Sequence, residues 1–286
     1  MITSYRAPLF CDASLAERIE RAEAQLVAKA SDAARQRGAN PAGFVLNIAG
    51  GVASFAAQHS PFNKVAGLGF GGVPSTSALE EIEGAFAAVA APVQIELAHL
   101  AEPEIAALLT RRGYQLVSFE NVLGLALDGE FDRATPPGIE VRPSADDELE
   151  SWLAVVVEGA SHPDTQGVPS YEDFPREAID SAERDFVAAG VRRYVALHDG
   201  VVAGGASFHT AEGLAQFTGA ATAPAHRRRG VQTALLSARL VDAAAVGCDL
   251  AVVTTQPASK SQQNVQRRGF DLLYTRAILV KQHPTA

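Results

Sequence analysis

The sequence predicts an α+β fold of two similar halves, each a mixed, mostly antiparallel sheet flanked by helices. One basis is the alternation of strand-like runs with amphipathic helices, in the order of a meander that feeds a helix and a crossover strand. The other is a faint internal repeat. Residues 111–114 (Arg-Arg-Gly-Tyr) resemble residues 267–270 (Arg-Arg-Gly-Phe), 156 residues later (267 − 111), which is close to half of the 286-residue chain.

The elements around this motif keep the same offset. Periodicity and composition predict matching strands at 93–97 and 249–253, matching helices at 75–90 and 231–246 and at 102–112 and 258–268, and matching strand pairs at 114–127 and 270–281. Between the halves, residues 128–137 have the composition of a linker. We therefore predict one domain at 1–128 and a second at 138–286, called below the N-terminal and C-terminal halves.

Further elements precede the shared block in each half. In the N-terminal half, apolar residues recur at helical spacing from Leu15 to Ala30 after a predicted Ser14 cap, and strands follow at 43–48, 52–55 and 64–70. In the C-terminal half we expect a strand at 139–142, helices at 146–158 and 171–188, and strands at 193–197, 201–208 and 214–222.

The most informative segment is 226–236, where three arginines and a glycine stand directly before an apolar-periodic helix. Backbone N–H groups at a helix N-terminus have no intrahelical partner, and the positive end of the helix dipole lies there, so the position favours an anion. Arg227, Arg228 and Arg229 add permanently charged donors that fit phosphate oxygens. Because three positive charges oppose the dipole unless an anion is present, a bound phosphate is favoured over a solvated loop.

Composition limits the partners. A formal charge of −9 and a pI near 5.3 argue against nucleic acid, so the arginines suit a small anionic ligand. The two cysteines, Cys11 and Cys248, form no CxxC pair and no metal-ligand spacing, which favours a reducing, cytoplasmic compartment and no metal. The chain shows neither a signal peptide nor an apolar run of bilayer length, so no membrane partner is expected.

Residues 139–281 resemble the GNAT superfamily of acyl-CoA-dependent N-acetyltransferases in element order and in motif. The family signature is Gln or Arg, two residues, Gly, one residue, then Gly or Ala, between the fourth strand and the third helix. Arg227 and Gly230 match it, Pro224 and His226 precede it as is common in the family, and Gln232 departs from the last position. Residues 268–270 (Arg-Gly-Phe) also resemble the family's Lys-x-Gly-Phe element.

The resemblance implies acetyl-CoA as co-substrate and direct transfer of its acetyl group to a primary amine, a small molecule or a peptide. Its pyrophosphate would lie on the loop and first helical turn formed by Arg227, Arg228, Arg229, Gly230, Val231, Gln232 and Thr233. Pantetheine would pair with strand backbone near Ala220, Ala221 and Thr222, much as an added strand does, with Ser261 and Asn264 on the other side.

The reaction needs a base for the amine and an acid for the thiolate. Residues upstream of the CoA loop are the candidates, namely Glu158, His162, Asp164, His209, Glu212 and Gln216, and we predict Glu158 and Gln216 as the catalytic pair. Gln216 is not a base but could orient the amine or a water. Many family members carry a tyrosine acid four residues before the Gly of the Lys-x-Gly-Phe element, where this chain has Val265.

Two other functions stay open. The missing tyrosine permits an acyl-CoA sensor or regulatory module without turnover. The glycine run from Gly67 to Gly72 satisfies the GxGxxG pattern of dinucleotide-binding sites, so a nicotinamide-dependent enzyme is the second alternative. Three residues separate this run from the next predicted helix. By the 156-residue offset this run corresponds to the CoA loop without its arginines. The N-terminal half is therefore expected to be a degenerate copy that completes the acceptor cleft or a homodimer interface.

Overall fold

The N-terminal half begins with a long helix and continues as a meander of short strands. The computed structural model describes residues 7–38, 40–163 and 166–282. In the N-terminal half they form α1 (Ala13–Gln36), β1 (Phe44–Ile48), β2 (Gly51–Phe55), β3 (Lys64–Ala66), α2 (Thr76–Ala88), β4 (Val93–Ala98), α3 (Glu104–Arg111) and β5 (Gln115–Ala126).

The C-terminal half repeats this order from the three-strand meander onward, and its three meander strands are longer. Its elements are β6 (Ile139–Pro143), the 3-10 turn η1 (Asp146–Glu148), α4 (Leu149–Ser161), α5 (Arg176–Ala188), β7 (Arg192–His198), β8 (Val201–Ala211), β9 (Leu214–Thr222), η2 (Pro224–His226), α6 (Val231–Ala245), β10 (Leu250–Thr255), α7 (Lys260–Gln266) and β11 (Asp271–Lys281). The 156-residue offset superposes α2 on α6, β4 on β10, α3 on α7 and β5 on β11, so the sequence repeat is a structural repeat.

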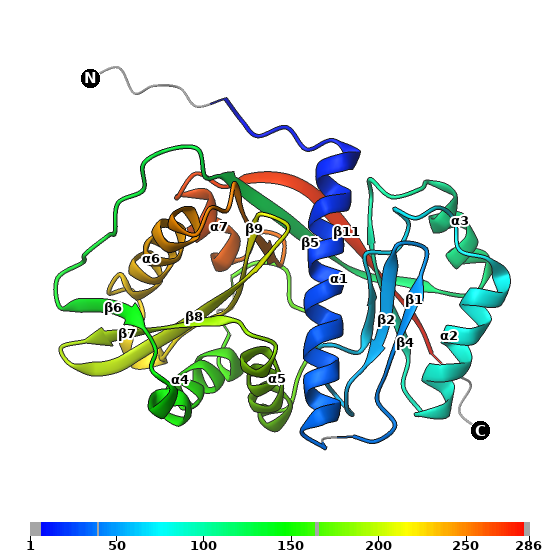
Figure 1. Ribbon diagram of the computed structural model, residues 1–286, viewed down its shortest axis with the longest axis horizontal. Helices are drawn as coiled ribbons and strands as arrows, with labels where there is room; N and C mark the ends of the chain where they lie inside the picture. Colours follow the sequence, from blue (N-terminus) through cyan, green and yellow to red (C-terminus); the bar gives the residue numbers. More distant parts are fainter. Residues whose placement is uncertain (1–6, 39, 164–165, 283–286) are drawn as a thin grey trace.

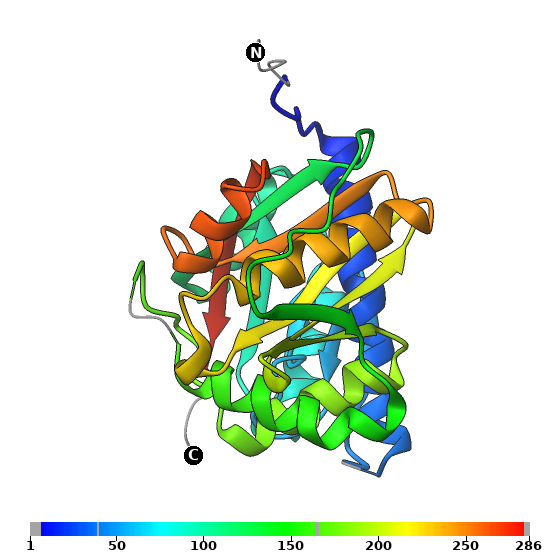
Figure 2. The same cartoon turned by 90° about the vertical axis from the view of Figure 1, so that its left-hand side faces the viewer.

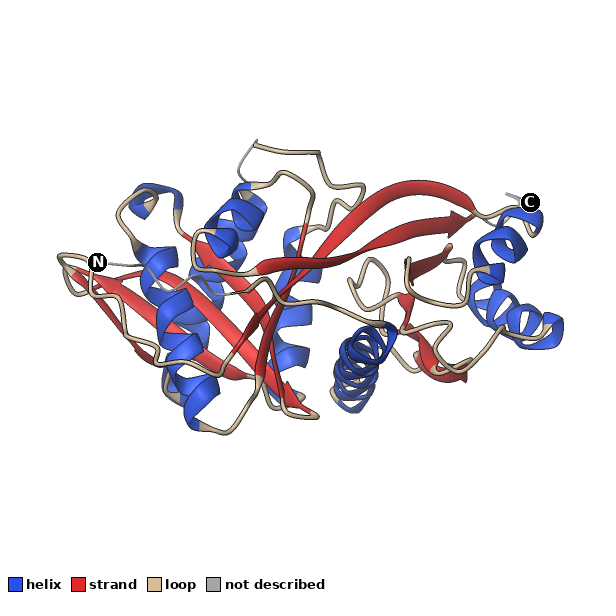
Figure 3. Ribbon diagram, turned by 90° about the horizontal axis from the view of Figure 1, so that it is seen from above, coloured by secondary structure: helices blue, strands red, loops and turns tan. Residues whose placement is uncertain are grey.

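All the strands join in one eleven-stranded sheet in the order β1-β2-β3-β4-β11-β5-β10-β9-β8-β7-β6. The two halves exchange their last strands, because β5 pairs with β10 of the C-terminal half and β11 pairs with β4 of the N-terminal half. β5 and β11 also pair with each other, antiparallel, at the centre of the sheet. Seen from above in Figure 3, the two long strands run side by side from one half to the other.

Helices cover both faces of the sheet. In the C-terminal half, α4 and α6 lie on opposite faces (Figure 2), and alternate residues of β7 divide between them. Tyr194 packs with the α6 side, whereas Val195 packs against Trp152 of α4, whose Nε1 donates to the Tyr194 carbonyl at 2.9 Å. This mostly antiparallel, helix-flanked sheet confirms the predicted fold class. In the described residues, no helix is long and apolar enough to cross a membrane.

α1 crosses the middle of the sheet (Figure 1), where a buried ion cluster holds it. Arg276 on β11 donates to Glu20 on α1 at 2.7 Å and lies 3.5 Å from Glu96 on β4, and all three side chains are 1% exposed. Lys64 on β3 contacts Glu96 at 2.5 Å. Although burial disfavours the charged form, Lys64 and Arg276 hold the pKa of Glu96 below its usual value. The cluster therefore ties α1 to both halves.

Several predicted boundaries were wrong for local reasons. Asp12, not Ser14, caps α1, because the Asp12 carboxylate accepts from the Leu15 N–H while the Ser14 hydroxyl donates to that carboxylate. β3 ends at Ala66, where Gly67 adopts φ 73°. α5 starts after Pro175, and the preceding residues form a loop. The segments expected to be strand pairs are single long strands, β5 and β11.

We expect Arg276→Met to lower the free energy of unfolding by about 3–5 kcal/mol, because it leaves Glu20 and Glu96 buried with less compensating charge. The matched control is Arg35→Met, which removes an arginine of α1 paired with Asp32 at the surface and should cost about 0.5 kcal/mol or less. Urea denaturation followed by circular dichroism measures both. Equal losses in the two variants would show that the buried cluster does not hold α1 in place.

Candidate active site

β9 and β10 lie side by side only where they begin. Residues 214–216 pair in parallel with residues 250–252, and no further pairing joins these strands in the described part of the chain. β9 continues to Thr222 and β10 to Thr255, so the strands part and leave a slot between them. At the same level β9 carries a bulge, where its register with β8 shifts and Gly219 adopts φ 52°.

The N-terminus of α6 lies at the open end of this slot. Arg228 (φ 63°) and Gly230 (φ 90°) turn the backbone into the helix, and no side chain caps it. The first bond of α6 runs from the Ala234 N–H to the Gly230 carbonyl at 3.0 Å, so the N–H groups of the first turn have no intrahelical acceptor. The first turn contains no acidic residue. This arrangement suits an anion.

The three arginines of the loop differ in what they contact. Arg227 donates to the carbonyls of Gly159 (3.3 Å), His162 and Thr222 (3.4 Å), so its side chain ties the end of α4 to β9. Arg228 and Arg229 are exposed, and no acid of the described chain pairs with them. Arg228 and Arg229 therefore present their guanidinium groups to solvent at the helix start, whereas Nε and Nη2 of Arg227 are already engaged by carbonyl groups.

The other predicted CoA residues surround the slot. Ala220 is exposed on β9, between a partly buried Gly219 and a buried Ala221. The side chain of Gln232, the residue that departs from the family signature, donates to the Thr222 hydroxyl at 2.9 Å and so points toward β9. Val231 is buried in the core beneath α6, whereas Thr233 is exposed. Ser261 is exposed and Asn264 partly buried on α7, and Val265, which replaces the family's tyrosine, is 6% exposed in the core.

The candidate bases lie on several different elements. Glu158 is exposed on α4, and its carbonyl lies 2.9 Å from His162 Nδ1. Glu212 sits in the β8–β9 turn, where its carboxylate accepts from Arg21 and Gln25 of α1 and so holds the turn to that helix. Asp164 lies outside the described residues.

Two of the candidates face the sheet centre. Gln216 is 8% exposed on β9, donates to the Glu23 carboxylate of α1, and has no partner for its own carbonyl oxygen. His209, directly across from it on β8, is 7% exposed with Nε2 3.4 Å from the Lys29 amine. Burial and the Lys29 charge lower the pKa of His209.

The structure adds Glu183, which sequence reasoning missed. This residue of α5 is 7% exposed, and its Oε2 has no hydrogen-bond partner. It packs over the β9 bulge so closely that a Cβ on Gly219 would lie 2.9 Å from that oxygen. Burial raises the pKa of Glu183 to about 7. The available signal was its position among the buried residues of an amphipathic helix, since a carboxylate on such a face needs a reason to be there.

The corresponding slot of the N-terminal half is closed. After β3 the glycine run folds back onto the β1–β2 turn, and the N–H groups of Gly69 and Gly71 both donate to the Ala49 carbonyl at 3.0 Å. Gly69 packs so tightly that a Cβ would lie 2.6 Å from Ile105 and 2.9 Å from Ala101. α2 begins only at Thr76, with Ser75 as its cap. The glycines of this run therefore allow close packing of the backbone. A dinucleotide site would require the run to lead directly into the N-terminus of a helix, and here it does not.

Comparison with known proteins agrees with this geometry. Residues 159–270 match the model of the acetyltransferase (GNAT) family. The match identifies this region as a GNAT domain, as predicted, and supports the class of acetyl-CoA-dependent acyltransferases. Among curated proteins, no sequence matches significantly.

Solved structures show the same fold over nearly the whole chain. A GCN5-related N-acetyltransferase from Kribbella flavida is 23% identical with a TM-score of 0.62, covering 90% of this chain and 96% of that one. A tandem GNAT protein from the clavulanic acid biosynthesis pathway is 16% identical with a TM-score of 0.59, covering 98% and 99%. A GCN5-related N-acetyltransferase from Sphaerobacter thermophilus is 17% identical with a TM-score of 0.55, covering 72% and 67%.

We expect Gly230→Ala to weaken acetyl-CoA binding about tenfold or more, because a Cβ there would lie 2.8 Å from Pro136 and displace N–H donors to a charged ligand. Gly247→Ala is the matched control at the other end of α6: its φ of 85° brings a similar strain of about 1 kcal/mol, in open space. Isothermal titration measures affinity, and thermal unfolding verifies comparable stability. Unchanged affinity in Gly230→Ala would remove the loop from the binding site.

Glu183 should make stability depend on pH. Its pKa of about 7 lies above the ordinary value of 4.5, so between these values the folded state binds more protons than the unfolded state, and stability falls as pH rises. The Glu183→Gln variant lacks this titrating group. Its free energy of unfolding, relative to that of the wild type, should therefore increase by up to about 3 kcal/mol as the pH rises from 4.5 to 7. Urea titrations at several pH values test this. Parallel pH profiles would contradict the burial of a titrating carboxyl group.

Proposed function

We propose that the C-terminal half transfers an acetyl group from acetyl-CoA to a primary amine by direct attack. The observation that carries the proposal is the parting of β9 and β10 directly beside the uncapped N-terminus of α6. The slot exposes strand backbone to which an amide-bearing chain can pair, and the helix end offers N–H donors for a pyrophosphate. Among the residues that the structure describes, only the C-terminal half combines the two, because the glycine run packs against the β1–β2 turn at the equivalent position.

In this proposal the loop residues hold the cofactor and the opposite face of the sheet receives the amine. Arg228, Arg229 and the first-turn N–H groups of α6 bind phosphate, and the backbone from Ala220 to Thr222 binds pantetheine. Glu183 accepts the proton of the attacking amine, since it lies against the bulge next to Ala220 and a pKa near 7 suits a base at neutral pH. Gln216 orients the amine.

The thiolate has no tyrosine acid beside it, because Val265 occupies that position within the core. A thiolate is a weakly basic leaving group, so it needs no strong acid and can take its proton from water. The same absence is what an acyl-CoA sensor would show. Release of free thiol distinguishes the two functions, since only an enzyme consumes acetyl-CoA in the presence of an amine.

We expect the protein to bind acetyl-CoA and not NAD in isothermal titration, and the double variant Arg228→Ala/Arg229→Ala to bind acetyl-CoA about 10- to 100-fold more weakly. Arg111→Ala, which removes an exposed arginine at the end of α3, is the control and should leave affinity unchanged. Thiol release is then followed across a panel of amines. Binding of NAD alone would refute the proposal, and acetyl-CoA binding without turnover of any amine would favour the sensor.

A further inference from the structure

An arginine without an acidic partner is buried against the β9 bulge. Arg239 of α6 is 3% exposed, and no carboxylate of the described chain forms an ion pair with it. Its guanidinium group lies over the ring of Phe217 on β9, 4.5 Å from the ring centroid. Because a buried cation without a counter-ion is costly, the place of Arg239 in the core requires a compensating interaction.

The hydrogen bonds of Arg239 supply this compensation. Its Nη1 donates to the Ser207 carbonyl of β8 at 3.0 Å and to the Thr218 carbonyl of β9 at 3.5 Å. Its Nε donates to the Leu235 carbonyl within α6 at 3.3 Å. Ser207 and Thr218 are cross-strand partners, and the register of β8 and β9 shifts directly beyond them. Arg239 therefore holds the two strands together at the residue pair where the bulge begins.

The other face of the bulge is covered by Glu183. Its helix, α5, packs with α4, which lies on the face of the sheet opposite α6 (Figure 2). A Cβ on Gly219 would lie 2.9 Å from one carboxyl oxygen of Glu183 and 3.0 Å from the other. The backbone of the bulge is therefore enclosed between a buried arginine on one face and a buried carboxyl group on the other.

The bulge also determines the direction in which β9 leaves β10. The parallel pairing of these two strands ends at Gln216 and Val252. Thr218, whose carbonyl accepts from Arg239, lies two residues further along β9. A β-bulge bends its strand and increases the local twist. The side chain that fixes the bulge therefore also fixes the open edge of β9, from there to Thr222.

We propose that Arg239 is a positioning residue for the acetyl transfer: from the α6 face it fixes the β9 bulge, and the bulge aligns the open edge of β9 and keeps Glu183 packed against Gly219. The inference rests on the proposed function, in which this edge binds pantetheine and Glu183 accepts the proton of the amine. Arg239 is buried in the core, so its influence on the reaction passes through the strand backbone.

The ionisation of Glu183 distinguishes this positioning role from a simple effect of charge. Burial raises the pKa of Glu183 to about 7. Loss of the Arg239 charge by itself could only raise this pKa further, because a cation favours the ionised carboxylate. Loosening of the bulge would instead admit water to the carboxyl group and lower its pKa toward the ordinary value of 4.5. The direction of the change therefore shows which role Arg239 has.

The experiment follows the carbon-13 chemical shift of the Glu183 carboxyl group against pH in the full-length protein, with Glu183→Gln to assign the signal. In Arg239→Met we expect the midpoint to fall from about 7 toward 4.5. We also expect kcat to fall about tenfold or more, because the reacting groups are misplaced. Acetyl-CoA affinity should fall much less, since the phosphate donors are unchanged. Arg239→Lys keeps the charge but loses the planar contact with Phe217, so it should show the same changes to a smaller extent.

Arg112→Met is the matched control, because it removes a largely buried arginine that pairs with Glu83 at 2.9 Å in the N-terminal half. It should lower stability and leave both the Glu183 midpoint and kcat unchanged. An unchanged or higher midpoint in Arg239→Met, or wild-type behaviour of Arg239→Lys, would overturn the inference and leave the proposed acetyl transfer intact. A lower midpoint in a protein that consumes no acetyl-CoA with any amine would support the hold of Arg239 on the bulge and refute the proposed transfer.

Discussion

The exchange of β5 and β11 is the constraint on which the rest of the structure depends. Each half ends in a strand that completes the other half's sheet, so neither sheet is whole without both halves. The exchange brings Arg276 into the centre, where it neutralises Glu20 of α1 and part of the charge of Glu96. Because a buried charge is tolerated only when it is paired, the position of α1 over the sheet follows from the strand order.

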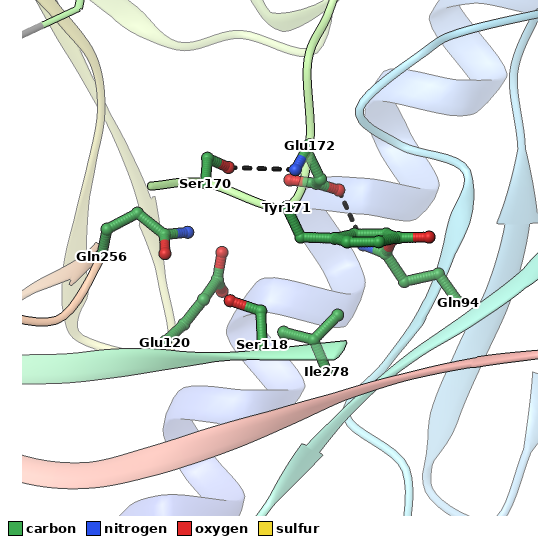
Figure 4. A pocket seen from close by; sticks show the side chains of 8 residues that line it. All are labelled: Gln94, Ser118, Glu120, Ser170, Tyr171, Glu172, Gln256 and Ile278. Atoms are coloured by element: carbon green, nitrogen blue, oxygen red, sulfur yellow. Dashed lines mark hydrogen bonds between the residues drawn. The ribbon is translucent and has the colours of Figure 1, made fainter. Parts of the chain in front are cut away.

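From the three-strand meander onward, the two halves share one element order but use it differently. In the C-terminal half the bulge at Gly219 and the early end of the β9–β10 pairing leave a slot beneath α6. In the N-terminal half β3 has only three residues, and the chain fills the equivalent position with glycine backbone packed against Ile105. The N-terminal half contributes instead Gln94 and Glu120 to a small recess that it shares with Glu172 and Gln256 of the C-terminal half (Figure 4).

The sequence predicted the elements well and their partners poorly. Periodicity located most helices and strands and the repeat predicted two like halves, because local patterns report which faces are buried. The same patterns do not predict which strand lies beside β5. The alternation of buried and exposed residues in β5 would be the same next to a strand of either half. Arg227 illustrates a similar limit: its residue type and spacing indicated a phosphate site, and only the packing shows that its side chain also reaches the carbonyls of Gly159 and His162. Glu183 and Glu120 escaped notice because carboxylates on buried faces are identified only when the packing is known.

The strand exchange also sets the order in which the protein can be completed during synthesis. β4 needs β11 as its neighbour, but β11 begins at Asp271, long after β4 ends at Ala98. At ordinary rates of translation the ribosome takes roughly 10 to 35 s to cover that distance. For this time the nascent N-terminal half carries an open sheet edge that any other extended chain could join. Yield in a cell should therefore depend on what shields β4 until the last strand emerges.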